Sequence, residues 1–309
     1  MLGFVWAFSQ GPVLADMAEK NPNVVVVSQD MGPISPFSER FPDRFFDVGI
    51  CEANLIGVAA GLAHAGKLPF VFGMAPFVSM RSFEQIRTDC GYNRNNVKII
   101  APCSGLEGGH WAATHHAVED LALLRLIPGM TVLCPADPGE GTRAVLAAAA
   151  VNGPVYIRFG YIEPIEGYTE DFVIGRAPVL RQGSDLAILA TGASVTQALR
   201  AHEILKKDGI SARVLNMHSI KPIDRDAIRK AAEEIGRLIT VEEHFVAGGL
   251  GGAVAEVLAD LGTGRLLRLG LQDEFVMEVA PYPDILRLVG IDAESIAAAA
   301  KTMLRKRLE

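Results

Sequence analysis

The sequence predicts an α/β protein built from two doubly wound domains, each a mostly parallel sheet with helices on both faces. Short runs of apolar residues, such as the four valines at 24–27, lack the polar alternation of a sheet with one wet face. Longer helical patterns lie between these runs, which is the order expected of βαβ units. The length of 309 residues suits two such domains.

The first domain is predicted to span residues 1–165. Its expected strands are 24–27, 70–72, 97–101, 131–133 and 155–159. Its expected helices are 13–20, 52–65, 83–87, 118–126 and 139–151. Because helices separate the strands, the strands are expected to run parallel.

A stretch rich in glycine, proline and acidic residues predicts a linker at 166–184, followed by a second domain at 185–309. The expected strands there are 187–191, 213–216, 238–241 and 266–269. The expected helices are 195–207, 224–235, 252–261 and 293–308. Asp224 and Asp292 stand at N-cap positions, and Gly209 follows the first of these helices as a stop signal.

Composition and charge limit the classes of function that this chain could have. The net charge is −7 and no basic stripe is present, which argues against nucleic acid as a partner. The four cysteines show no C-x-x-C spacing, so we expect reduced thiols and no metal site in this chain. No apolar run reaches the ~18 residues that span a bilayer. The start of the chain lacks the basic residues of a secretory signal. We therefore expect a cytoplasmic protein without a membrane partner.

The segment DVGICEANLIGVAAGLAHAG at 47–66 is the most informative one. Its second half places Gly and Ala at helical spacing, which suits a helix that approaches another backbone closely, as at a subunit interface. Glu52 stands near the helix start, and a carboxylate there would by itself be expected to complement the helix dipole. Ile50 and Leu55 are expected to give it apolar surroundings.

Several motifs resemble those of transketolases. FDVGICEANLIGVAAGLA, which contains Glu52, resembles the glutamate-bearing motif of their pyrimidine-binding domain, and VVVVSQDM, RSFEQIRTD and ATHHAVEDLALLRLIPGMTVLCPAD match further parts of that domain. LNMHSIKPID and TVEEHFVAGGLGGAVAEVL resemble the transketolase C-terminal domain. The resemblance covers nearly the whole chain. It implies a thiamine-diphosphate-binding pyrimidine domain at 1–165, followed by a transketolase C-terminal domain at 185–309.

The resemblance assigns roles around the cofactor ring. The family glutamate matched by Glu52 hydrogen-bonds N1′ of the thiamine aminopyrimidine, which makes Glu52 both catalytic and cofactor-binding. His115 matches a histidine that contacts the donor ketose and assists proton transfer. Phe77 matches a ring that stacks on the pyrimidine, and Met74 and Met80 fall where relatives carry further aromatics. A methionine can fill such space through its polarizable sulfur, although residue type alone fits a core position equally.

The resemblance also implies substrate contacts. Asp30 matches an aspartate near the substrate hydroxyls or the partner chain, and Arg158 matches an arginine that holds the substrate phosphate. His110 and Trp111 replace an acidic pair that reads sugar hydroxyls, and Cys103 replaces a histidine. Because an indole and an imidazole cannot accept hydrogen bonds as a carboxylate does, the substrate is expected to differ from the usual sugar phosphates.

The GDG…N motif that binds Mg²⁺ and the diphosphate in full-length transketolases is absent from this sequence. The resemblance therefore implies a split enzyme in which an N-terminal subunit supplies the Mg²⁺ and diphosphate site, in an α₂β₂ assembly. The reaction implied is transfer of a two-carbon ketol unit from an anionic ketose to an aldose.

Three other functions remain open from the sequence. The β subunit of a 2-oxo acid dehydrogenase E1 component shares the two-domain layout and the glutamate. Deoxyxylulose-phosphate synthase is similar but is usually one long chain with pyruvate as donor. A catalytically silent regulatory subunit would keep the fold without the chemistry. Glu52, Phe77 and His115 argue against the silent subunit, whereas the changed acidic loop argues for it.

Overall fold

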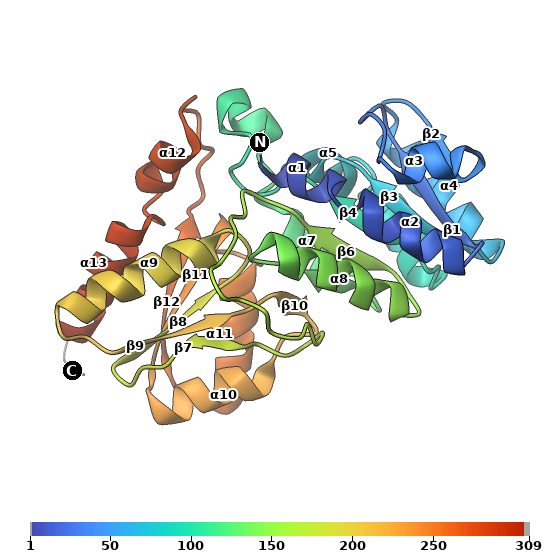
Figure 1. The fold of residues 1–309 in the computed structure, drawn as a ribbon. Coiled ribbons are helices and arrows are strands. Elements are labelled where there is room, and N and C mark those ends of the chain that lie inside the picture. Colours follow the sequence, from blue (N-terminus) through green and yellow to red (C-terminus); the bar gives the residue numbers. More distant parts are fainter. Residues whose placement is uncertain (1, 306–309) are drawn as a thin grey trace.

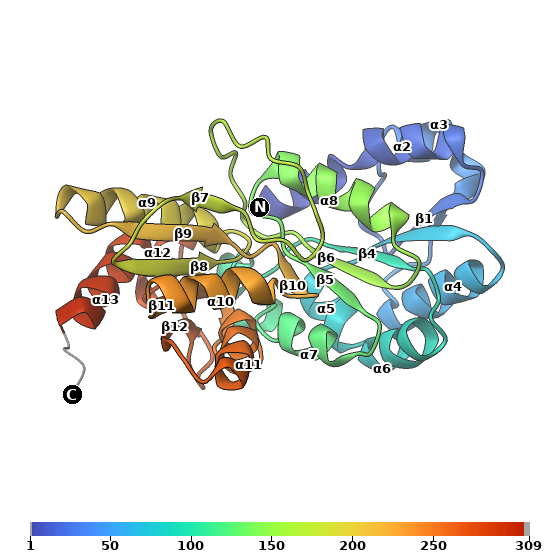
Figure 2. The ribbon, with the colours of Figure 1, turned by 90° about the horizontal axis from the view of Figure 1, so that it is seen from below.

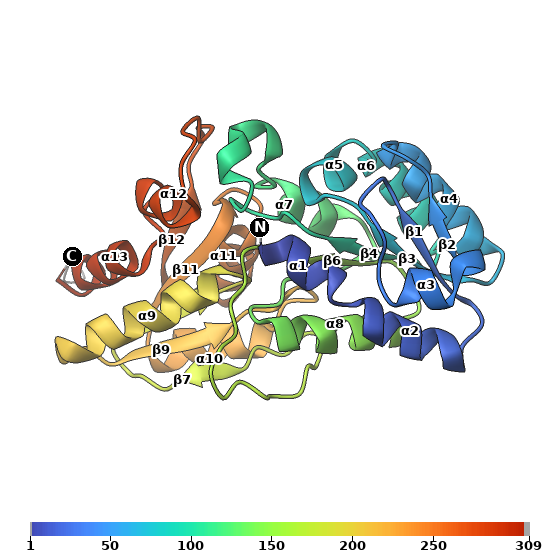
Figure 3. The ribbon, with the colours of Figure 1, turned by 45° about the horizontal axis from the view of Figure 1, so that its top comes forward.

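The computed structural model describes residues 2–305 and confirms two sheets, each with helices on both faces (Figure 1). Within these residues no helix is long and apolar enough to cross a membrane. Apart from one strand at Ser219–Lys221, the first sheet precedes the second along the chain. Figure 3 shows the two sheets side by side with the amino-terminal helix near their junction.

The first sheet has seven strands in the order β10-β5-β6-β4-β3-β1-β2, all parallel except β10. The strands are β1 Val24–Ser28, β2 Phe45–Asp47, β3 Leu68–Phe72, β4 Lys98–Ala101, β5 Thr131–Leu133, β6 Val155–Arg158 and β10 Ser219–Lys221. Four of them, β1, β4, β5 and β6, are buried at every residue, which suits the mainly apolar sequence of each. Lys98 of β4 and Arg158 of β6 are charged residues that are buried as well.

Helices cover both faces of this sheet (Figure 2). One face carries α1 Leu2–Phe8, α2 Gly11–Lys20, α3 Phe37–Arg40 and α8 Pro138–Ala150. The other carries α4 Glu52–His64, α5 Ala75–Met80, α6 Phe83–Gln85 and α7 Asp120–Leu126. Two short 3₁₀-helices lie at Pro42–Arg44 and Gly109–His115, and a π-helix lies at Ile86–Tyr92.

The second sheet has five strands in the order β12-β11-β8-β9-β7, with β7 antiparallel. They are β7 Val179–Arg181, β8 Leu186–Ala190, β9 Ala212–Asn216, β11 Arg237–Phe245 and β12 Arg265–Leu271. Helices α9 Ser194–Lys207, α12 Tyr282–Leu288 and α13 Ala293–Arg305 pack on one face, and α10 Arg225–Glu234 and α11 Leu250–Leu261 on the other. The expected caps are confirmed, since Asp224 and Asp292 accept hydrogen bonds from the backbone of the first helical turns.

Strand β10 joins the two domains. It follows β9 in the second domain but pairs antiparallel with β5 of the first sheet. The backbone N–H of Cys134, just after β5, donates to His218 O at 2.8 Å. On the same side, one apolar core runs from Leu121 and Val132 to Leu215 and Leu250. The two domains therefore share buried surface as well as backbone hydrogen bonds.

Several elements differ from the predictions. The helix expected at 83–87 continues as the π-helix to Tyr92, and helix α7 begins two residues later than expected. Strand β7 lies within the segment predicted as linker and belongs to the second sheet. Helix α13 is described to Arg305, so the predicted end at 308 lies outside the described residues. Strands β2, β7 and β10 were not predicted because each has only three residues and ends in a charged one, so no apolar run marks it. The equally short β5 was predicted because apolar residues flank it on both sides.

Candidate active site

Glu52 is the first residue of α4, at the edge where the parallel strands of the first sheet end. Its side chain is only 6% exposed. Glu52 Oε1 accepts a hydrogen bond from Arg81 Nη1 at 2.9 Å. Because a buried carboxylate without a partner is costly, this ion pair stabilises Glu52 in its orientation. The carboxyl thus meets a side chain from the end of helix α5.

The same arginine lies over an aromatic ring. Arg81 Cζ is 4.1 Å from the centroid of the Phe77 ring, within the range of a cation–π contact. The two residues are four apart, and the backbone N–H of Arg81 donates to Phe77 O where α5 ends. One guanidinium therefore touches both the carboxyl of Glu52 and the face of Phe77.

Three further rings continue this arrangement from the segment Gly109–His115. The ring centroids of Phe77 and His115 are 5.1 Å apart in an edge-on contact. The ring centroids of Trp111 and His115 are 4.8 Å apart, and those of His110 and Trp111 are 4.5 Å apart. Burial lowers the pKa of His115, and the nearby Arg81 and His110 lower it further. An imidazole that is neutral near pH 7 can accept a proton, as a general base must.

We call this group the Glu52 cluster. Its members are Glu52, Phe77, Arg81, His110, Trp111 and His115. The structure thus brings together five of the residues predicted from the sequence. It adds Arg81, whose motif was recognised but whose role was not. The available signal was its spacing of four from Phe77, which places the two side chains on one face of a helix.

The loop that carries His110 and Trp111 is fixed at its base by buried carboxyls. Glu107 Oε1 accepts a hydrogen bond from the backbone N–H of Gly3, and Glu243 Oε2 accepts one from Leu106. Glu243 also accepts a hydrogen bond from the Tyr282 hydroxyl of α12. Burial raises the pKa of Glu107 to about 7. Contacts from the amino terminus and from the second domain therefore position one wall of the Glu52 cluster.

Three further predicted residues lie outside the Glu52 cluster. Met74 is the half-buried residue that precedes α5, and Met80 is the exposed last residue of that helix. Asp30 follows β1 with its side chain exposed and a φ of 50°, and its N–H donates to the carboxylate of Asp47. Ile50 was expected to help enclose Glu52, and this is wrong: it is 69% exposed, whereas Leu55 is buried.

Two predicted substrate residues are buried instead of presented. Arg158 is 4% exposed and donates to Asp120 Oδ2 at 2.8 Å and to the carbonyls of Ala117 and Glu243. Its guanidinium therefore links β6 to β11 of the second domain. Cys103 is fully buried, and burial raises the pKa of its thiol to about 12. Both side chains are thus buried in this structure, and their contact with a substrate stays a prediction. The sequence match could not show which way these side chains turn.

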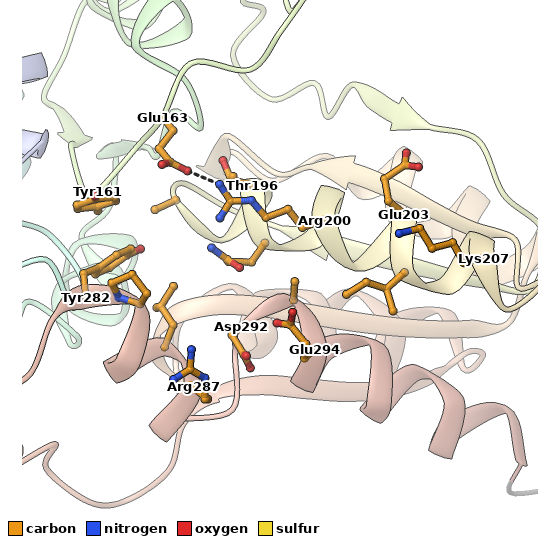
Figure 4. Close-up of a pocket in the computed structure, with 16 residues that line it drawn as sticks. Tyr161, Glu163, Thr196, Arg200, Glu203, Lys207, Tyr282, Arg287, Asp292 and Glu294 are labelled. Atoms are coloured by element: carbon orange, nitrogen blue, oxygen red, sulfur yellow. Dashed lines mark hydrogen bonds and ion pairs between the residues drawn. The ribbon is translucent and has the colours of Figure 1, made fainter.

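A separate cavity of about 490 Å³ lies between α9, α12 and the start of α13 (Figure 4). Its charged lining mixes both signs, and Arg200 is paired with Glu163 across its rim. None of the residues predicted for the site lines it. The predicted chemistry is thus concentrated at the Glu52 cluster.

Among the residues described here, no group of three or more His, Cys, Asp or Glu could hold a metal ion.

Family models match both domains. Residues 4–161 match the transketolase pyrimidine-binding domain, and residues 175–296 match the transketolase C-terminal domain. This chain belongs to the transketolase family. The expected family and fold class are thereby confirmed, and thiamine diphosphate is the cofactor that this family implies.

Curated relatives include both chains of similar length and longer ones. A putative transketolase C-terminal section of Methanocaldococcus jannaschii is 40% identical, with 96% of this chain and 95% of that protein covered. An apulose-4-phosphate transketolase subunit of Phocaeicola vulgatus is 40% identical, with 95% of each covered. A 1-deoxy-D-xylulose-5-phosphate synthase of Thermomicrobium roseum is 41% identical over 95% of this chain but only 48% of its own.

A solved structure described as a split gene transketolase, inactive beta4 tetramer, superposes with a TM-score of 0.89 at 40% identity. It covers 97% of this chain, and 98% of that chain is matched. The similarity to this split-gene transketolase chain therefore extends over nearly the whole of both chains.

Proposed function

We propose that this chain is the C-terminal subunit of a split, thiamine-diphosphate-dependent transketolase that moves a two-carbon ketol unit from an anionic ketose to an aldose. The observation that carries the proposal is a buried carboxyl, Glu52, beside an aromatic ring, Phe77, with a planar cation in contact with both. The Phocaeicola relative, which has a similar length, is named for apulose 4-phosphate, and this supports an anionic substrate.

The residues present fit the aminopyrimidine of the cofactor. The space between Glu52 and Phe77 accepts a planar, positively charged guanidinium that donates to the carboxyl and stacks on the ring. An aminopyrimidine is also flat, and it also needs a carboxyl as hydrogen-bond partner and an aromatic ring to stack on. Bound there, thiamine diphosphate supplies a carbon nucleophile that cleaves and re-forms the bond beside a ketose carbonyl.

This chain contributes proton control and positioning. Glu52 holds a proton at pyrimidine N1′. Because the Glu52 side chain is buried, water does not compete for this hydrogen bond. Phe77 supports the ring, with Met74 and Met80 at the ends of the same helix. His115 lies edge-on to Phe77 and moves a proton at the substrate oxygen. Trp111 and His110 extend from His115, where they replace carboxylates and favour an atypical sugar. Asp30 is proposed to contact the substrate hydroxyls or the partner chain.

The other half of the site belongs to a partner. An N-terminal subunit is proposed to hold Mg²⁺ and the diphosphate, in an α₂β₂ assembly, because the chain has no GDG motif. The solved relative described as an inactive beta4 tetramer supports the need for such a partner. All four cysteines are unpaired, which fits a cytoplasmic enzyme.

One experiment tests this function. The chain is mixed with its N-terminal partner, thiamine diphosphate and Mg²⁺, and is offered either a phosphorylated ketose with an aldose or pyruvate with glyceraldehyde 3-phosphate. We expect ketol transfer with the first pair, and none when either chain is left out. Condensation of pyruvate would instead favour a deoxyxylulose-phosphate synthase activity, which the Thermomicrobium relative makes the second candidate. A third mixture contains a 2-oxo acid and an artificial electron acceptor, and reduction of that acceptor would indicate an E1 component.

A further inference from the structure

Arg81 makes the two contacts that the proposed function assigns to the cofactor ring. Its guanidinium donates to the buried Glu52 carboxyl at 2.9 Å, and its Cζ lies 4.1 Å from the Phe77 ring centroid. We propose that Arg81 is a built-in stand-in for the aminopyrimidine, which closes the site in the unloaded subunit and must swing out before the cofactor can bind. This inference rests on the proposed function, because it takes Glu52 and Phe77 as the pyrimidine contacts.

The stand-in satisfies a group that would otherwise be costly. Glu52 is 6% exposed, and a carboxylate buried to that degree loses hydration that only a donor can replace. Arg81 supplies a charge-assisted hydrogen bond, which is about twice as strong as a neutral one. The guanidinium also covers the face of Phe77 that would otherwise meet water. The unloaded site is thus held closed by one side chain.

The same side chain is free to leave. Arg81 is 54% exposed, and Glu52 is the ion-pair partner recorded for it. Its backbone is anchored at the end of α5 through the hydrogen bond to Phe77 O, so side-chain rotation alone can vacate the site. Displacement therefore requires no change in the fold.

Competition of this kind has a measurable consequence. A ligand that binds only the open state has an apparent Kd equal to the intrinsic Kd divided by the open fraction. If Arg81 closes the site for most of the time, its removal lowers the apparent Kd for the cofactor. A half-exposed ion pair with one stacked ring corresponds to an open fraction of roughly 0.1 to 0.3, and hence to a roughly 3- to 10-fold tighter Kd.

The test measures the Kd for thiamine diphosphate, with Mg²⁺, of the reconstituted two-subunit complex by titration calorimetry. Arg81→Met and Arg81→Gln remove the guanidinium, the first with an apolar stem and the second with a polar end. Arg87→Met is the matched control, because Arg87 is similarly exposed but pairs with Glu84 outside the cluster. We expect both Arg81 variants to bind the cofactor about 3- to 10-fold more tightly than wild type and the Arg87 variant to match wild type.

The outcomes separate this inference from the proposed function. Unchanged or weaker binding in both Arg81 variants, with wild-type binding that Glu52→Ala weakens, overturns the stand-in alone. If wild type binds no thiamine diphosphate, or binds it equally well in Glu52→Ala, the proposed function and the stand-in both fail. A tighter Kd in the Arg87 variant as well would also overturn the stand-in, because it would indicate a general effect of surface charge.

Discussion

We expect Glu52→Gln to lower the rate of ketol transfer by the reconstituted complex about 10³-fold, within the range that positioned proton transfer contributes. Glutamine has nearly the shape of glutamate and keeps an oxygen that can accept from Arg81. It cannot exchange a proton with pyrimidine N1′. The loss should therefore fall on kcat, while the thermal unfolding midpoint stays near that of wild type.

Glu84→Gln is the control for this change. Glu84 lies in the same region of the chain but is largely exposed and forms an ion pair with Arg87, away from the Glu52 cluster. Its rate should equal that of wild type. An undiminished rate in Glu52→Gln, measured with saturating cofactor, would remove Glu52 from the chemistry and would favour the silent regulatory subunit.

The second large effect concerns stability. We expect Asp120→Ala to lower the free energy of unfolding by about 3–5 kcal/mol, the usual cost of breaking a buried ion pair. Asp120 is fully buried and accepts from both Arg158 Nε and the Tyr156 hydroxyl. Without it, the buried guanidinium of Arg158 loses its ion-pair partner. Urea unfolding of the chain measures the difference.

A double variant tests the mechanism of this loss. Asp120→Leu combined with Arg158→Met replaces both charges by apolar groups, and such exchanges are often neutral or stabilising. The double variant should therefore be more stable than Asp120→Ala. If Arg158 instead binds the substrate phosphate, Arg158→Met alone would raise KM severalfold and leave the unfolding free energy unchanged, which would contradict the structural role found for it here.

The parts of the fold predicted from the sequence are those with a local signal. Strands β1 and β4 were predicted because burial on both faces selects mainly apolar residues, as in the four valines of β1 and the two isoleucines of β4. Helix α4 was predicted because its Gly and Ala spacing is regular. Strand β10 carries no such signal: three residues of one domain pair with a strand 86 positions away. This pairing depends on how the two domains pack against each other, and no short stretch of sequence carries that information.

The site shows the same division. Glu52, Phe77 and His115 stand in long matched motifs, and the structure places them within one cluster. Arg158 also matches a family residue, but its side-chain direction is set by hydrogen bonds from its guanidinium to Asp120 of helix α7 and to a backbone carbonyl of β11. Arg81 was missed because its contacts depend on the turn at the end of α5, which aims the guanidinium at Glu52. Residue identity could be predicted, whereas side-chain direction could not.

The most direct test is a structure of this chain assembled with its partner and loaded with thiamine diphosphate. The account predicts one Glu52 oxygen within about 2.6–3.2 Å of pyrimidine N1′, with the ring on Phe77. It also predicts that Arg81 has left its position over that ring. A loaded complex in which Glu52 still pairs with Arg81, and the pyrimidine lies elsewhere, would contradict it.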